Sequence, residues 1–241
     1  MPSEFNINNG LDYLSQLPAI SLWLIFLMEN ILITIMVLFF GKIVHRKYSE
    51  QPFTPYRYVT REWKICTVTN ILNTAITYAG FKLWESGYIM ITTHVSLIIL
   101  TDFLLLFIAM DFLMFVFHYL IHKTFLYKIV HQLHHQAIHP KPIDLFVLHP
   151  LETISFGSLW LILLALWPFN IYAIIIYLVI NVIFGLIGHL GIEPLSHKVR
   201  KLPLIKYLGT SSFHHNHHLK EEYNFGFYTS IWDRLFGTFK V

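Results

Sequence analysis

Two short histidine-rich stretches carry the side chains with the most evident chemistry. Residues 131–135 read His-Gln-Leu-His-His and residues 214–218 read His-His-Asn-His-His, so both contain the pattern His-x-x-His-His. On a helix, positions i, i+3 and i+4 lie on one face about one turn apart. Each copy is therefore expected to direct two or three imidazoles at a single point, which would form a metal pocket.

Further histidines add to these two stretches. His118 and His122 are spaced i, i+4, and His189 follows a long apolar run in Gly-Leu-Ile-Gly-His. Together these are more imidazoles than one metal ion can take, so two adjacent metals are predicted. The alternative is that the histidines belong to a metal-sequestering tail or cap helices singly.

The ligand type restricts the metal. Neutral imidazole suits zinc, copper, iron and nickel, whereas calcium and magnesium prefer oxygen ligands, and no carboxylate is interleaved in the clusters. Structural zinc usually includes cysteine among four ligands, and the only cysteine is Cys66. A zinc finger is excluded, and a pair of redox-active irons is favoured over two zinc ions.

The composition indicates a membrane protein. The chain has 241 residues, room for one domain, and 55% of them are apolar. The single cysteine permits no internal disulfide. The net charge of +3 is slight, and no nucleic-acid partner is expected. The start has no charged n-region or cleavage site, so no removable signal peptide is predicted.

The apolar runs predict an all-α polytopic membrane protein with about five embedded helices. Strong runs cover residues 21–40, 88–121, 151–167 and 171–192, and a weaker run at 65–84 is diluted by threonine and asparagine. Residues 168–170 form a tight hairpin between the last two. The first twenty residues, which include Glu4 and Asp12, form a non-cytoplasmic lead.

Basic residues set the orientation. The segment at 41–64 carries several Lys and Arg and is predicted to be a loop, because Pro52 and Pro55 should break any helix there. If the weak run at 65–84 crosses the membrane, every Lys and Arg except Lys82 falls on one side, which is then cytosolic. The histidine clusters fall on the same side, where they form a cytosolic metal-binding cap.

Three polar residues near the clusters have open roles. Asp111 precedes His118 on one helical stripe and either orients an imidazole or pairs with another helix. Asn181 is either a polar neighbour of the site or part of a helix–helix hydrogen bond. His149 opens a His-Pro-Leu-Glu sequence typical of a helix start and is otherwise a candidate ligand.

The clusters, with Asn-Phe-Gly at residues 224–226 and Trp-Asp-Arg-Leu-Phe-Gly-Thr at 232–238, resemble the fatty acid hydroxylase superfamily. That group includes sterol C5-desaturases, C4-methylsterol oxidases and cholesterol 25-hydroxylase. The resemblance begins at about residue 110. It divides the single integrated domain into N-terminal membrane helices at 1–110 and a catalytic region at 111–241.

The resemblance implies a diiron enzyme, with zinc as a possible substitute metal, that hydroxylates or desaturates a sterol-like lipid. Dioxygen is the co-substrate, and two electrons come from a separate cytochrome b5- or ferredoxin-like donor with its reductase, because no haem domain is fused. No catalytic residue beyond the metal ligands is implied. The implied ligands are His118, His122, His131, His134, His135, His189, His214, His217 and His218.

Two positions depart from the family pattern. His215 stands where members usually lack histidine, which leaves open a register in which His215 and His218 pair. His189 lies in Gly-His-Leu-Gly, where members have His-Ser-Gly or a similar turn. The location implied is the endoplasmic reticulum membrane in a eukaryote or the inner membrane in a bacterium.

Two other functions compete with the enzyme. A zinc or iron transporter would place its ligands at mid-depth along a pore, paired with acids. A family member that has lost catalysis would only bind lipid. The clusters at predicted helix ends favour the enzyme.

Overall fold

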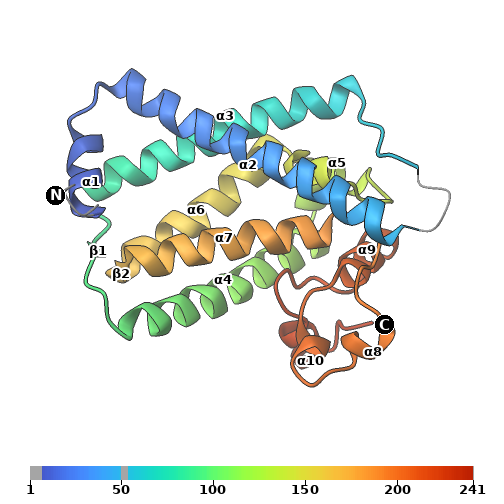
Figure 1. Cartoon of the computed structure of the whole chain (residues 1–241). Coiled ribbons are helices and arrows are strands. Elements are labelled where there is room, and N and C mark those ends of the chain that lie inside the picture. Colours follow the sequence, from blue (N-terminus) through green and yellow to red (C-terminus); the bar gives the residue numbers. More distant parts are fainter. Residues whose placement is uncertain (1–6, 50–53, 241) are drawn as a thin grey trace.

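The computed structural model contains five long helices, which lie side by side (Figure 1). The structure describes residues 7–49 and 54–240, so Glu4 and Pro52 lie outside the described residues. Helix α2 packs on α3, α3 packs on α6, and α4 packs on both α6 and α7. The predicted all-α fold is confirmed. The bounds of the five helices are α2 (Ala19–Tyr48), α3 (Thr60–Glu85), α4 (Ile98–Lys123), α6 (Pro150–Leu166) and α7 (Ile171–Gly188).

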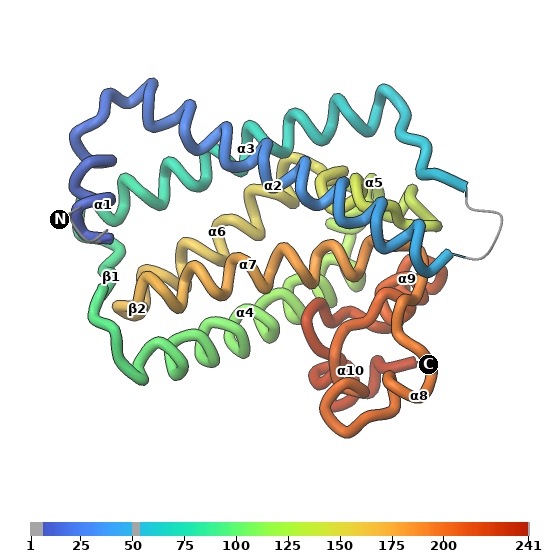
Figure 2. The backbone as a smooth tube through the Cα atoms, in the orientation of Figure 1, coloured from blue at the N-terminus to red at the C-terminus, as the bar shows by residue number. Residues whose placement is uncertain are grey.

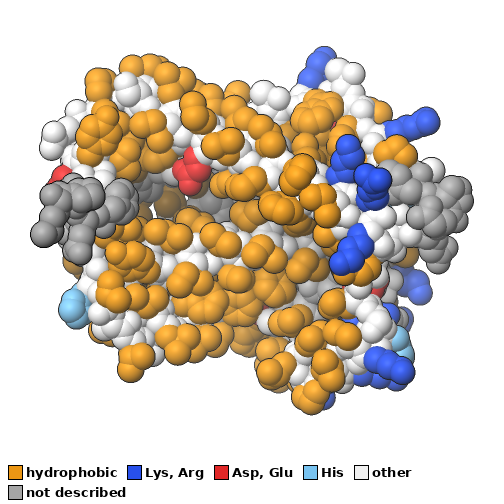
Figure 3. Space-filling model, in the orientation of Figure 1, with side chains coloured by type: hydrophobic (Ala, Val, Ile, Leu, Met, Phe, Trp, Pro, Cys, Tyr) orange, Lys and Arg blue, Asp and Glu red, His pale blue; other side chains and the backbone are white. Residues whose placement is uncertain are grey.

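Three of these helices, α2, α4 and α7, are long and apolar enough to cross a membrane. Apolar side chains cover most of the face shown in Figure 3, and Lys and Arg gather at one end of it. An apolar surface of this kind is stable against lipid, where helices satisfy their own backbone hydrogen bonds. The chain is therefore a membrane protein, as predicted. Helix α6 is shorter, at 17 residues.

Helix α3, the weaker predicted span, carries polar side chains that face α2. Thr34 Oγ1 donates a hydrogen bond to Asn70 Oδ1 over 3.0 Å, and Asn30 Nδ2 lies 3.5 Å from Thr74 Oγ1. These bonds satisfy polar groups that would be costly to bury unpaired. The polarity of α3 is thus explained by its packing, and five embedded helices remain a prediction.

The predicted loop at 41–64 is wrong at its start, because α2 continues through Lys42 and Lys47 to Tyr48. Lysine is a good helix former, and its long side chain reaches water at a membrane surface. Between α2 and α3, the described residues Ser49 and 54–59 are not helical, and α3 begins at Thr60.

The predicted start of the helix at 88–121 is also wrong. Helix α4 begins at Ile98 because the preceding chain is extended: β1 (Ile91–Thr92) pairs in parallel with β2 (Phe169–Asn170). Strand β2 lies in the turn between α6 and α7, so the tight hairpin predicted at 168–170 is present. The pairing joins the ends of α4 and α7 that lie far from the two histidine-rich stretches.

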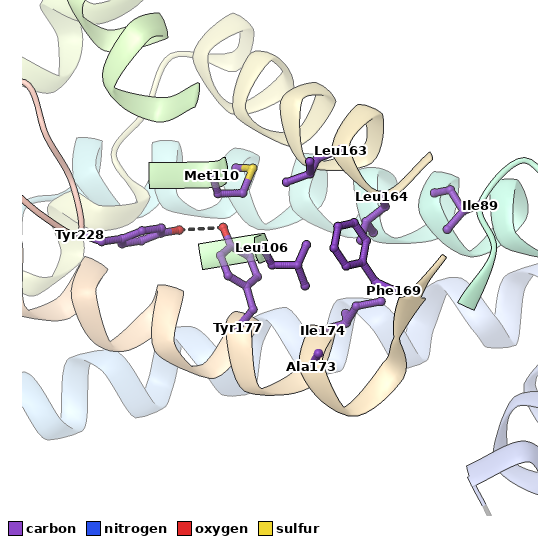
Figure 4. Packing of buried hydrophobic residues seen from close by; sticks show 10 residues of the cluster. All are labelled: Ile89, Leu106, Met110, Leu163, Leu164, Phe169, Ala173, Ile174, Tyr177 and Tyr228. Atoms are coloured by element: carbon purple, nitrogen blue, oxygen red, sulfur yellow. Dashed lines mark hydrogen bonds between the residues drawn. The ribbon is translucent and has the colours of Figure 1, made fainter. Parts of the chain in front are cut away.

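The main apolar core lies between α4, α6 and α7 (Figure 4). Leu106 and Phe169 are buried there, and Tyr228 reaches in from the C-terminal part of the chain. The Tyr228 hydroxyl lies 2.7 Å from the hydroxyl of Tyr177 on α7. This contact anchors the C-terminal segment to the membrane helices.

The short elements gather mostly at one end of the long helices, as Figure 2 shows for α5 and α9. Segments distant in sequence meet there. The short elements are α1 (Ile7–Ser15), a π-helical turn η1 (Tyr127–His131), α5 (Gln132–His135), a 3-10 turn η2 (Pro142–Phe146), α8 (His197–Arg200), a 3-10 turn η3 (Ile205–Tyr207), α9 (Ser211–Leu219) and α10 (Ile231–Phe236).

Candidate metal centre

The structure brings all nine histidines of the predicted ligand set together in two groups. Within each group, one ring nitrogen per residue lies within 4.8 Å of those of the other members. The five-His group consists of His118, His122, His131, His135 and His217. The four-His group consists of His134, His189, His214 and His218.

Four parts of the chain position these side chains. Helix α4 carries His118 and His122 one turn apart near its C-terminal end, and His189 caps the end of α7. The first histidine-rich stretch runs from the π-helical turn η1 into α5, and the second is in α9. All these helix ends converge, because α4 packs on α7, α7 on α9 and α4 on η1.

Each histidine-rich stretch divides its imidazoles between the two groups, which corrects the expectation of a single point for each. His131 and His135 join the five-His group, whereas His134 joins the four-His group. In α9, His214 and His218 join the four-His group and His217 crosses to the other. Since successive residues on a helix are about 100° apart, i+3 and i+4 point to opposite sides of i, and in both stretches i goes with i+4 while i+3 goes to the other group.

The spacing of the ring nitrogens fits a metal ion in each group. His118 Nε2 lies 2.9 Å from His131 Nε2, and His214 Nε2 lies 3.1 Å from His218 Nε2. Two nitrogens that bind one ion at about 2.1 Å, with a right angle between the bonds, are about 3.0 Å apart. The imidazoles are thus as close as two ligands of one ion.

Unsatisfied ring nitrogens support the same fit. Among the described residues, the buried Nε2 atoms of His135 and His217 have no hydrogen-bond partner. Burying a polar atom without a partner is costly unless something else binds it. A metal ion bound by these nitrogens would remove that cost.

Several imidazoles are held from behind through Nδ1. His118 Nδ1 donates to the carbonyl of Phe225 over 2.8 Å, and His217 Nδ1 donates to that of Tyr223 over 2.6 Å. His189 Nδ1 donates to the carbonyl of Gly185 over 2.8 Å. A carbonyl can only accept, so Nδ1 carries the proton and Nε2 keeps a free lone pair for a metal.

Burial keeps the imidazoles neutral. It lowers the pKa of His189 to about 4, and the pKa of His134, His214 and His217 well below the usual range. Neighbouring imidazoles lower the last three further, because two positive charges would repel. The neutral ring is the form that binds metal.

Two histidines with open roles lie outside both groups. His149 caps α6, where its Nδ1 accepts a hydrogen bond from the Leu151 backbone over 3.2 Å. His215 Nε2 lies 3.0 Å from Nδ1 of the exposed His139. The geometry therefore pairs His214 with His218, in place of the register that would pair His215 with His218.

The two other polar candidates bind the C-terminal segment. Asp111 accepts hydrogen bonds from the backbone of Tyr228 and Thr229 and from the Trp232 indole, so it orients no imidazole. Asn181 accepts a hydrogen bond from the Tyr228 hydroxyl over 2.6 Å. Because Tyr228 is not in a helix, this bond is not a helix–helix contact. Both anchor the segment that carries the carbonyls facing His118 and His217.

Sequence reasoning missed Glu152. Its Oε1 atom lies 2.7 Å from His131 Nδ1. A signal is present in the His-Pro-Leu-Glu sequence, but that sequence indicates only a helix start and does not show what the acid contacts. The carbonyls of Tyr223 and Phe225 carry no signal in residue type, since every residue has one.

Comparison with known proteins finds lipid enzymes. A Delta(7)-sterol 5(6)-desaturase of Leptosphaeria maculans is 29% identical over 50% of this chain and 32% of the relative. Methylsterol monooxygenase 1 of Gallus gallus is 27% identical over 50% of this chain and 40% of the relative. A very-long-chain aldehyde decarbonylase of Oryza sativa subsp. indica is 28% identical over 83% of this chain and 75% of the relative.

The chain spans less than half the length of the desaturase and the monooxygenase. No solved structure matches it. The family model for fatty acid hydroxylase matches residues 103–238, which include both histidine groups and the closing sequences. Because this match covers more than half of the 241 residues, the chain belongs to the fatty acid hydroxylase family.

Proposed function

We propose that this protein is a membrane-bound oxygenase or desaturase that oxidises a lipid at two iron ions held by the nine histidines. The observation that carries the proposal is the division of nine buried or half-buried imidazoles into two adjacent groups at the ends of apolar helices. Family membership and the printed activities of the relatives support it. Zinc is the metal that could substitute in the same sites.

Two irons with nitrogen ligands, supplied with dioxygen and two electrons, provide an oxidant for an unactivated C–H bond. The residues of the chain hold and orient the metal ligands and keep the site dry. The five-His and four-His groups keep neutral rings aimed inward, and Glu152 and the backbone carbonyls fix the orientation of His118, His131 and His217. The surrounding helices exclude bulk water from the site.

A lipid substrate follows from where the histidine groups lie. They are at the ends of helices whose outer surfaces are apolar, so a molecule dissolved in the bilayer can approach from the side. The names of the relatives include two sterol enzymes and one enzyme of very long acyl chains. We favour a sterol-like substrate, with hydroxylation and desaturation both open.

The electrons would come from a separate cytochrome b5- or ferredoxin-like donor and its reductase. Lys and Arg gather at one end of the molecule, which supports a cytosolic position for that end and for the histidine groups. In a eukaryote the expected location is the endoplasmic reticulum membrane, and in a bacterium the inner membrane. The catalytic region is proposed to be residues 111–241.

The test compares lipids from cells that express the wild type or the His134→Ala variant. Mass spectrometry should detect an oxidised lipid that depends on dioxygen in the wild type and is absent from the variant. His139→Ala is the matched control, because His139 is exposed and lies outside both groups, and it should keep the product. Equal product with His134→Ala would contradict the proposal.

Transport is tested separately in liposomes. The enzyme proposal expects tightly held iron and no metal crossing the bilayer. Loosely held zinc that crosses the membrane of liposomes containing the purified protein would replace the enzyme with a transporter.

A further inference from the structure

The closing segment, residues 223–238, makes hydrogen bonds to imidazoles of the five-His group. The carbonyl of Tyr223 accepts from His217 Nδ1, and the carbonyl of Phe225 accepts from His118 Nδ1. Among the described residues, no such hydrogen bond joins the closing segment to the four-His group. The ring of Phe227 lies edge-on to that of His214, with centroids 6.4 Å apart, but the hydrogen bonds that orient imidazoles from this segment reach the five-His group alone.

Asp233 holds the peptide that faces His118. Its carboxylate is fully buried and accepts hydrogen bonds from the backbone N–H groups of Phe225 over 2.8 Å and Gly226 over 2.7 Å. The Gly226 N–H and the Phe225 carbonyl belong to the same peptide unit, which is planar. Asp233 therefore holds the N–H side of the planar Phe225–Gly226 peptide, and the carbonyl on its other side accepts the hydrogen bond from His118.

The surroundings of this peptide leave it no room to turn. A Cβ atom on Gly226 would lie 2.2 Å from the Thr229 carbonyl oxygen and 2.8 Å from Asp233 Oδ2, so only glycine fits. Thr238 Oγ1 donates to the other carboxylate oxygen over 2.7 Å and fixes Asp233 itself. Thr238 thus orients the Asp233 carboxylate, and Asp233 in turn orients the peptide whose Phe225 carbonyl contacts His118.

Asn224 stabilises the segment between its two carbonyl contacts. Its backbone has a φ of 60°, in the left-handed region that asparagine tolerates better than most residues. Its side chain donates to the carbonyl of Lys240 over 2.9 Å and accepts from the Lys240 N–H over 2.8 Å. These two hydrogen bonds to Lys240 hold the backbone at Asn224, the residue that separates the Tyr223 and Phe225 carbonyls.

We propose that Asp233 is a positioning residue that sets the metal affinity of the five-His group separately from that of the four-His group. It acts through the Phe225–Gly226 peptide on His118, and the closing segment as a whole orients His118 and His217. The inference rests on the metal sites of the proposed function. It needs no assumption about the substrate or the reaction.

The experiment titrates the metal-free, detergent-purified full chain with Co²⁺ and follows the visible absorption of the ion and its stoichiometry after desalting. The wild type should bind two Co²⁺ per chain. In Asp233→Asn, the amide can accept only one of the two N–H groups, so one site should bind about 10- to 100-fold more weakly while the other is unchanged. His134→Ala, which impairs the four-His group, identifies which spectrum belongs to which site.

Asp102→Asn is the matched control. Asp102 is also a buried carboxylate that accepts a backbone N–H, from Asn170 over 2.7 Å, but it lies in the first turns of α4, far along the helix from His118. This variant should keep both Co²⁺ affinities. Equal weakening of the two sites in Asp233→Asn, or no change in either, would overturn the proposal.

If Asp233→Asn does not fold, Thr238→Val tests the same positioning role of Asp233. It replaces the hydroxyl that fixes the Asp233 carboxylate with a methyl group of similar size. The expected result is a smaller, several-fold loss at the five-His group alone, and an unchanged or uniform affinity would again refute the idea. If the wild type binds two Co²⁺ but oxidises no lipid, the proposed function fails while this inference stands.

Discussion

Glu152 Oε1 lies 2.7 Å from His131 Nδ1, and the exposed fractions of the two side chains are 1% and 4%. The carboxylate belongs to the first turn of α6, and the imidazole ends the π-helical turn η1. With Nδ1 held from this side, His131 Nε2 faces His118 Nε2 at 2.9 Å. Helix α6 therefore orients a member of the five-His group.

Replacement of Glu152 by glutamine should loosen the metal of the five-His group. The amide is a weaker acceptor than a carboxylate, so metal bound there should be lost to a chelator about tenfold faster or more. Glu29→Gln is the control, because Glu29 is an exposed acid in α2, on a helix that carries none of the nine histidines. Equal rates of metal loss in wild type and Glu152→Gln would count against an orienting role.

The register of the second histidine stretch can be tested by two neighbouring variants. His214→Ala should lower the metal content by about one ion per chain, because His214 Nε2 faces His218 Nε2. His215→Ala should keep the full metal content, because His215 faces His139 outside both groups. The reverse pattern in elemental analysis would mean that His215 and His218 are the ligand pair.

Gly191 follows His189 closely and should tolerate no side chain. Its φ is +65°, and a Cβ atom would lie 2.4 Å from the Pro140 carbonyl oxygen. Gly191→Ala should therefore lower the thermal midpoint more than Gly87→Ala, where φ is +80° but nothing lies within 4 Å. The control costs only the left-handed backbone, about 1–2 kcal/mol. Similar losses in a melting experiment would show that Pro140 gives way easily.

Asp144 predicts a pH-dependent stability. Burial raises the pKa of its carboxyl from 3.8 to about 6, against the opposing hydrogen bond from the Lys141 backbone. A carboxyl whose pKa is higher in the folded chain contributes stability that is lost as pH rises through the folded value. Above that pH, the buried charge opposes folding.

Asp144→Asn should therefore raise the thermal midpoint at about pH 8, and the gain should shrink at about pH 5. The exposed Asp12, replaced by asparagine, is the control for removal of one negative charge. A gain that is larger at the lower pH would reverse the sign of the argument.

The sequence predicted which histidines would meet, because residue type and helical spacing are local properties. It could not predict how each stretch divides its rings between two groups. That division depends on how α5 and α9 are oriented relative to each other and to the end of α4, which is a tertiary property. The same limit applies to Glu152, whose contact with His131 depends on how α6 packs against η1.

The helix boundaries show a similar limit. An apolar run at 88–121 suits a helix throughout, and only the pairing of Ile91 and Thr92 with Phe169 and Asn170 makes its first part extended. That partner lies more than 70 residues along the chain, so the local pattern of the run does not reveal the pairing. Asp111 likewise contacts the closing segment, which follows it by more than a hundred residues.

The metal content of the purified wild-type chain tests the central claim most directly. After loading with Fe²⁺ without oxygen and desalting in detergent, elemental analysis should find two irons per chain. His217→Ala and His134→Ala, one from each group, should each retain about one. A wild type that holds one iron or none, or two variants that keep both irons, would contradict the account.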